Sequence, residues 1–120
     1  MDLVINEIES GLPGELPVEG AETFAVHLRV VLGERGKEGA EAFYFIAASP
    51  TGLHAEIGKK GFTLMRGLIL MDRFSLTTVH RAIDNVINHA RSLETWNEIV
   101  RFFNRYGVYE SEDMDGEFDP

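Results

Sequence analysis

Two acidic runs contain the residues of this chain whose types and spacing most readily suggest chemistry. Six carboxylates fall within residues 1–22 and six within 110–120, and neither segment contains lysine or arginine. Neighbouring carboxylates can act as an acid and a base, and the Asp-Met-Asp-Gly-Glu stretch at 113–117 has part of the spacing of a calcium loop. A calcium loop also needs a glutamate at its twelfth position, which this stretch does not supply. Two stronger interpretations remain open, a solvated tail and a surface that binds a basic partner.

The other candidates for catalysis or metal binding lack the required spacing. The four histidines include no pair at the i, i+4 spacing of a helical metal site, and the chain has no cysteine. No serine lies in a Gly-x-Ser-x-Gly sequence. Gly33, Gly36 and Gly39 lack the Gly-Lys-Ser/Thr ending of a phosphate loop and are better explained as the turn of a hairpin. We therefore expect no catalytic residue, no metal and no cofactor.

Several strands must position these residues. Alternating apolar side chains predict strands at 2–9, 24–30 and 43–47, of which the last two form a hairpin around the glycine-rich turn. The apolar run within 63–71 predicts a more deeply buried strand, and 108–109 predicts a short final one.

The helices are indicated by their capping residues. Three start signals are present, at Ser49-Pro50, at Ser75, and at Thr95 with Glu98 in capping-box spacing. The first helix should end near Gly58 or Gly61, and Gly107 should end the third as a left-handed cap. Together the elements predict an α+β fold, in which an antiparallel sheet of about four strands packs against two main helices on one face. We expect a single domain over 1–109 and an acidic tail over 110–120.

Composition restricts the classes of partner. The net charge is −9, which argues against nucleic acid and against anionic membranes, because both attract lysine and arginine. The N-terminal residues lack the pattern of a signal peptide, and no apolar run approaches the length of a spanning helix. These features predict a cytoplasmic protein.

Several short motifs follow one another between Phe24 and Met114. A glycine-rich hairpin at 31–43 is followed by Ser49-Pro50, then by Arg66 in a predicted strand, by Thr-Trp-Asn-Glu-Ile at 95–99 and by Tyr-Glu-Ser-Glu-Asp at 109–113. In this order the motifs resemble the immunity protein 8 family of bacterial polymorphic toxin systems, whose sequences end in a similar Trp-Glu-Phe-Glu-Asp.

The chain departs from the family pattern at several of these motifs. Gly52-Leu53 stands where the family has Trp-Leu, and Met65-Arg66-Gly67 stands where it has Gly-Arg-His. Phe74-Ser75 replaces Tyr-Asp, and Tyr109 replaces Trp. Most of these changes keep an apolar residue at an apolar position, so they affect the expected identity of the binding partner more than the expected fold.

The resemblance implies a protein that binds and neutralises a cognate toxin encoded beside it and has no catalysis of its own. Charge segregation favours the same function, since an acidic surface can cover the basic active-site cleft of an enzyme such as a nuclease. Tyrosines beside acids suit an interface because they combine apolar area with a polar tip. The residues that we expect to bind the toxin are Tyr106, Tyr109, Glu110, Glu112, Asp113, Asp115 and Glu41.

Two other functions stay open on the sequence alone. One is a small ligand-binding or enzymatic domain with an anion pocket near Arg66, because a buried arginine requires an anion. An internal salt bridge is the favoured explanation of such an arginine. The other is an oligomer-forming module that pairs through an exposed strand, so both a monomer and a homodimer are compatible with the sequence.

Overall fold

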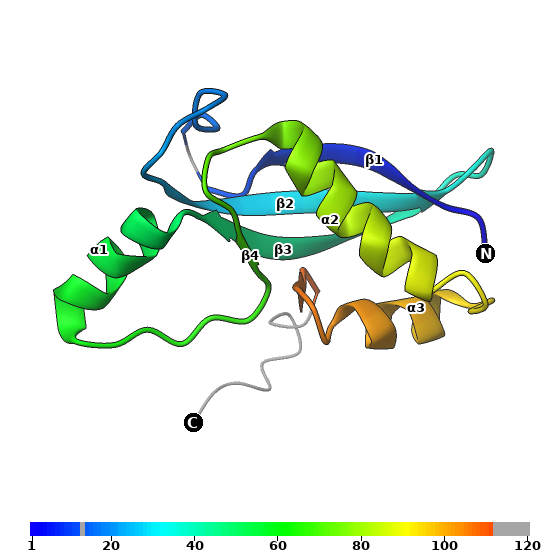
Figure 1. Ribbon diagram of the computed structural model, residues 1–120. Helices are drawn as coiled ribbons and strands as arrows, with labels where there is room; N and C mark the ends of the chain where they lie inside the picture. The colour runs from blue at the N-terminus through cyan, green and yellow to red at the C-terminus, as the bar shows by residue number, and fades with distance from the viewer. Residues whose placement is uncertain (13, 112–120) are drawn as a thin grey trace.

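The computed structural model describes residues 1–12 and 14–111, and the predicted α+β fold is confirmed (Figure 1). The elements follow in the order β1 (Leu3–Ser10), β2 (Ala25–Glu34), β3 (Ala40–Ala48), α1 (Pro50–Lys60), β4 (Leu68–Leu70), α2 (Leu76–His89), α3 (Trp96–Phe103) and β5 (Val108–Tyr109). Within the described residues, no helix has the length and apolar character needed to cross a bilayer.

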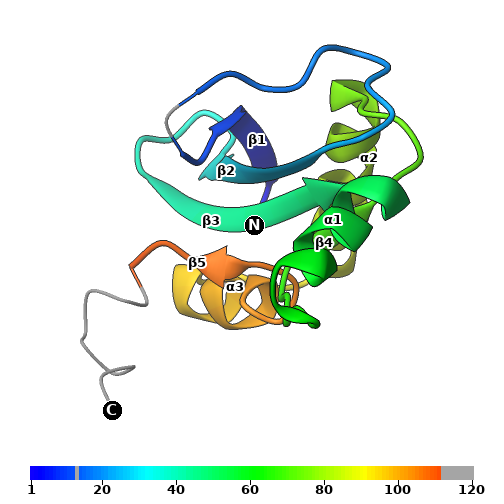
Figure 2. The same ribbon diagram turned by 90° about the vertical axis from the view of Figure 1, so that its left-hand side faces the viewer.

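The strands form one mixed sheet in the order β1-β2-β3-β4, with β5 paired to β3. β1 with β2, β2 with β3, and β3 with β5 are antiparallel, whereas β4 runs parallel to β3. Since β2 occupies one edge of β3 along its whole length, β4 and β5 share the other edge, one after the other. Helix α2 crosses in front of the strands in Figure 1 and lies to their right in Figure 2.

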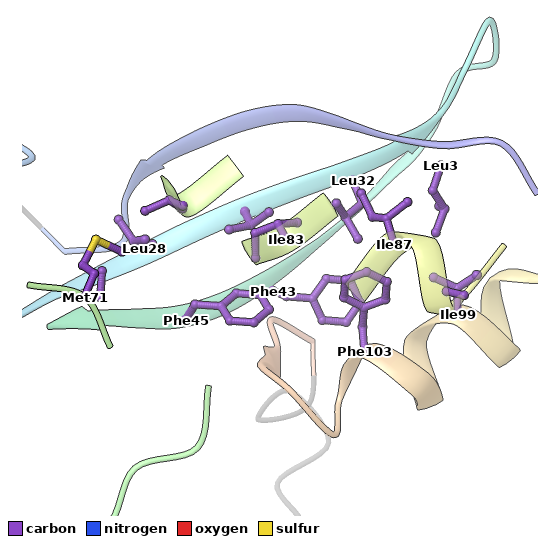
Figure 3. Close-up of a cluster of buried hydrophobic side chains, with 14 of the residues drawn as sticks. Leu3, Leu28, Leu32, Phe43, Phe45, Met71, Ile83, Ile87, Ile99 and Phe103 are labelled. Atoms are coloured by element: carbon purple, nitrogen blue, oxygen red, sulfur yellow. The ribbon is translucent and has the colours of Figure 1, made fainter. Parts of the chain in front are cut away.

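The core lies between one face of the sheet and helices α2 and α3 (Figure 3). Alternate residues of β2 and β3 are buried on this face, as the sequence pattern predicts. The phenyl rings of Phe43 and Phe103 have centroids 5.3 Å apart and join β3 to α3. The fully or nearly fully buried side chains of α2 and α3 in this cluster are Val79, Ile83, Ile87, Ile99 and Phe103.

The predicted helix starts are confirmed. The hydroxyl of Ser49 accepts the backbone N–H of Gly52 at 3.1 Å, and Ser75 accepts that of Thr78 at 3.2 Å. Thr95 and Glu98 form both halves of a capping box at the start of α3. Helix α1 ends at Gly61, whose φ of 86° is the left-handed conformation expected of a terminating glycine.

The deeply buried strand predicted at 63–71 is wrong. Only Leu68–Leu70 are paired as a strand, and Leu64 is 88% exposed while Leu70 is 56% exposed. The apolar run suggested burial, but β4 is the terminal strand in the order of the sheet, and of its three side chains only Ile69 packs against the core while Leu68 and Leu70 are exposed.

The prediction that Gly107 is a left-handed cap of α3 is also wrong. The helix ends at Phe103, its cap is Asn104 in a right-handed conformation, and Gly107 does not have a positive φ. A Cβ at Gly107 would lie 2.7 Å from the ring of Phe45. Glycine is therefore needed here because the ring packs directly on the backbone.

Candidate functional site

The sheet has one face that neither α2 nor α3 covers, and we call it the open face. It consists of the residues of β1, β2, β3 and β5 that point away from the core. Residues directly opposite each other in neighbouring strands share a face, so the register places Glu9 beside Arg29, and Arg29 beside Tyr44. Tyr44 is in turn opposite Val108 of β5. Side chains from four strands therefore meet on this face.

A hydrogen-bonded cluster of Glu9, Arg29, Tyr44 and Glu110 lies on the open face, and we call it the Arg29 cluster. The guanidinium of Arg29 binds both carboxylate oxygens of Glu110, with Nε–Oε2 and Nη2–Oε1 distances of 2.5 and 3.0 Å. Its Nη1 donates to Glu9 Oε1 at 2.9 Å, and the hydroxyl of Tyr44 donates to Glu110 Oε2 at 2.9 Å. This bidentate contact is typical of arginine, because the planar guanidinium matches the geometry of the two carboxylate oxygens.

The charges of the Arg29 cluster stabilise one another. The hydrogen bonds that Arg29 donates lower the pKa of Glu110 below its ordinary value, and the same bonds to Glu110 and Glu9 raise the pKa of Arg29. The hydrogen bond to Glu110 also raises the pKa of Tyr44, because it holds the phenol proton. The cluster contains two carboxylates and one guanidinium, so negative groups outnumber positive ones.

Two of the predicted toxin-binding residues, Tyr109 and Glu41, lie together. The Tyr109 hydroxyl donates to Glu41 Oε2 at 2.7 Å, and the Tyr109 ring lies 5.5 Å from that of Phe43. Because Phe43 belongs to the core, Tyr109 points to the helix-covered side of the sheet, whereas the adjacent Glu110 points to the open face.

The other predicted residues are distributed more widely. Tyr106 is 44% exposed, packs against Phe102 with the two rings tilted by 52° and their centroids 5.5 Å apart, and lines an apolar cavity of about 170 Å³ beside Leu68 and Val86. It thus belongs to the helix-covered side of the molecule. The remaining three acids, Glu112, Asp113 and Asp115, lie outside the described residues.

Sequence reasoning missed three members of the Arg29 cluster, namely Glu9, Arg29 and Tyr44. Alternation does place each of them on the outward side of its strand. What the sequence lacks is the register that sets Glu9 opposite Arg29 and the β5 pairing that brings in Glu110. The contacts of Arg29 that result, with Glu9 and with Glu110, join residues 20 and 81 positions apart in the sequence.

The proposed anion pocket near Arg66 depended on a buried arginine, and that premise is wrong. Arg66 is exposed and precedes β4 instead of lying within a buried strand. Among residues 1–12 and 14–111, no group of three His, Asp or Glu side chains is arranged to hold a metal ion. The described geometry is that of a surface, with a hydrogen-bonded cluster of charges on the open face of the sheet.

Comparison with known proteins gives one match. No curated protein and no solved structure matches this chain. The model of the family described as Immunity protein 8 matches residues 12–114, which include β2 to β5, helices α1 to α3, and Arg29, Tyr44 and Glu110 of the Arg29 cluster. That range covers most of the sequence, and the chain therefore belongs to the Immunity protein 8 family.

Proposed function

We propose that this protein is a non-catalytic immunity protein that binds a cognate toxin in the cytoplasm and neutralises it by covering a basic active-site surface. The observation that carries the proposal is the family match over residues 12–114. The charge distribution supports it, because the two end segments hold twelve of the twenty acidic residues and none of the eleven lysines and arginines. Such a concentration of one sign attracts and selects a partner of the opposite sign.

A nuclease is the toxin class that this charge fits best. An enzyme that binds nucleic acid must present lysine or arginine to the phosphates, so its active site is a basic cleft. An acidic protein can occupy that cleft and exclude the substrate without chemistry of its own. The chain itself has the wrong sign for binding nucleic acid, with a net charge of −9.

The proposed contacts fall into two groups. Glu110 is held at the open face by Arg29 and Tyr44, and Glu112, Asp113 and Asp115 follow it in the sequence. We propose that these acids face the basic surface of the toxin. Glu41, Tyr106 and Tyr109 are the second group, and of these Tyr106 presents the most accessible aromatic ring.

The test is protection of a cell from the toxin domain encoded beside this gene. We expect cells that express the toxin domain to grow when this chain is coexpressed, and the purified chain to bind the domain in solution. The matched control is an unrelated acidic protein of similar size, which should not protect. If cells with this chain die as readily as cells with the control, the proposed function is wrong.

A further inference from the structure

The open face presents apolar side chains to solvent as well as charges. Val31 of β2, Tyr44 and Ile46 of β3 and Val108 of β5 are all only partly buried. They contrast with their neighbours along each strand, such as Val30, which is completely buried against the helices. An apolar surface that the fold itself leaves uncovered is typical of a region that contacts another molecule.

A hollow of about 250 Å³ lies at one end of the open face. Its walls come from the loop after β1, from β2, β3 and α1, and from the loop before β4. The lining residues are Leu12, Ala25, His27, Ile46, Glu56 and Met65. Leu12 is 58% exposed and forms one wall of the hollow. The volume is below the range of about 300–1,000 Å³ that is typical of small-molecule sites, and it suits a single inserted side chain.

Negative charge lies next to this hollow on the same face. Glu9 and Glu110 are held in place by Arg29, and Glu7 is exposed opposite Val31, two positions from Glu9 on the same side of β1. Carboxylates that are already fixed lose little conformational freedom when a partner binds. These three carboxylates outnumber the single guanidinium of Arg29.

We propose that the open face is the surface on which the toxin docks. An apolar side chain of the toxin fills the hollow beside Leu12, while a neighbouring lysine or arginine pairs with Glu7 and Glu9. Charge complementarity selects this occupant. A second copy of the chain would set the same carboxylates against each other, and nucleic acid would be repelled.

This inference rests on the proposed function and deepens it by naming the docking face and the chemistry of the toxin segment. It differs from the contacts proposed above in that the centre of the interface is the sheet and not the run of acidic residues that begins at Glu110. Hot spots of interfaces are usually side chains seated in pockets near the centre, whereas charges at the margin mainly affect the association rate.

Two pairs of matched variants test the docking face by calorimetric titration of the toxin domain into the full chain. Leu12→Ser is paired with Val18→Ser, since the two apolar residues are 58% and 77% exposed but Val18 is next to Glu19, whose carboxylate accepts the backbone N–H of Leu76 at the start of α2. Glu7→Lys is paired with Asp84→Lys, because both acids are exposed and Asp84 lies on α2. We expect about tenfold or greater loss of affinity for Leu12→Ser and Glu7→Lys, and little change for their controls.

The outcomes separate the two proposals. If the wild-type chain binds and the Leu12 and Glu7 variants keep its affinity, or if the Val18 and Asp84 variants lose as much affinity as the Leu12 and Glu7 variants do, the docking face is overturned and the immunity function stands. If the wild-type chain shows no binding, the immunity function fails and the docking face fails with it. Urea unfolding of each variant checks the fold. Glu7→Gln supplies a milder change should Glu7→Lys unfold, and an unchanged affinity for that variant would also contradict the proposal.

Discussion

At the scale of single residues, Arg29 organises the open face. It is the one cation of the Arg29 cluster and binds carboxylates from both ends of the sequence, Glu9 in β1 and Glu110 after β5. The side chains of Arg29 and Glu110 are 30% and 34% exposed, so water screens this pair less than a fully exposed one. The cluster therefore stabilises the fold and also sets the charge pattern of the open face.

Replacing Glu110 by glutamine should lower the free energy of unfolding by about 1 kcal/mol at neutral pH, because Arg29 loses its bidentate ion pair with a carboxylate. The measurement is urea unfolding of both proteins. The matched control is Glu22→Gln, which removes an exposed pair with Arg73 at 2.9 Å and should change stability by no more than about 0.5 kcal/mol. Equal effects of the two substitutions would show that the Arg29 cluster is no more stabilising than an ordinary surface pair.

The same pair of proteins has a predicted pH dependence. Contact with Arg29 lowers the pKa of Glu110 below its ordinary 4.5, so folding favours the ionised carboxylate. This stabilisation is complete above the ordinary value and is lost as the pH falls through the lowered pKa of the folded protein. Wild type should therefore lose more stability than Glu110→Gln when the pH is reduced from about 6 to about 3. Parallel losses in the two proteins would contradict this assignment.

At the scale of elements, the start of α1 is pressed against β2. The hydroxyl of Ser49 is fully buried and accepts the backbone N–H groups of Gly52 and Phe24, both at 3.1 Å. A Cβ at Gly52 would lie only 1.9 Å from the carbonyl oxygen of Phe24, whereas Gly58 of the same helix has no neighbour within 4 Å of its Cβ position. The two glycines of one helix thus have opposite surroundings.

The substitutions Gly52→Ala and Gly58→Ala should change stability in opposite directions. Gly52→Ala forces the helix away from β2 and should cost about 2 kcal/mol or more, as overpacked substitutions do. Gly58→Ala should stabilise the protein by about 0.5–1 kcal/mol, because alanine is more stable than glycine at an exposed position inside a helix. Thermal and urea unfolding measure both changes. A harmless Gly52→Ala would show that α1 does not pack as closely as described.

At the scale of the whole molecule, the two sides of the sheet have different roles. One side is buried against α2 and α3 and forms the core, while the open face carries the Arg29 cluster and the hollow beside Leu12. The net charge of −9 adds a long-range field to this surface. Such a field accelerates encounter with a basic partner and weakens as salt is added.

Neutralising Glu112, Asp113 and Asp115 as amides should slow association with the toxin domain and reduce its dependence on salt, because fewer charges attract the partner. Glu110 is left intact, since changing it would also disturb Arg29. The matched control removes three exposed acids elsewhere, in Glu38→Gln, Asp84→Asn and Glu94→Gln. The association rate of each variant with the toxin domain is measured by stopped flow at several salt concentrations. The C-terminal acids have no special role if both triple variants behave alike.

Local signals predicted most elements correctly. The apolar alternation of β2 and β3 and the caps at Ser49, Ser75 and Thr95 depend on residues within a turn or a strand of one another, so sequence spacing reveals them. The errors arose where a distant segment decides the outcome. An apolar run at 63–71 forms a short exposed strand because of its place in the sheet, and Gly107 is required by the ring of Phe45.

The sequence by itself determined the α+β class, the segregation of charge to the two ends and the family, since composition, periodicity and motif order are properties of the chain alone. Only the tertiary structure decided which charges meet. It separates Glu110 from Tyr109 onto opposite sides of the sheet and joins Glu110 to Arg29 and Glu9. The physical reason is that strand register and the parallel or antiparallel sense of pairing are set by packing between distant segments, and a shift of one residue would turn each of these side chains to the other face.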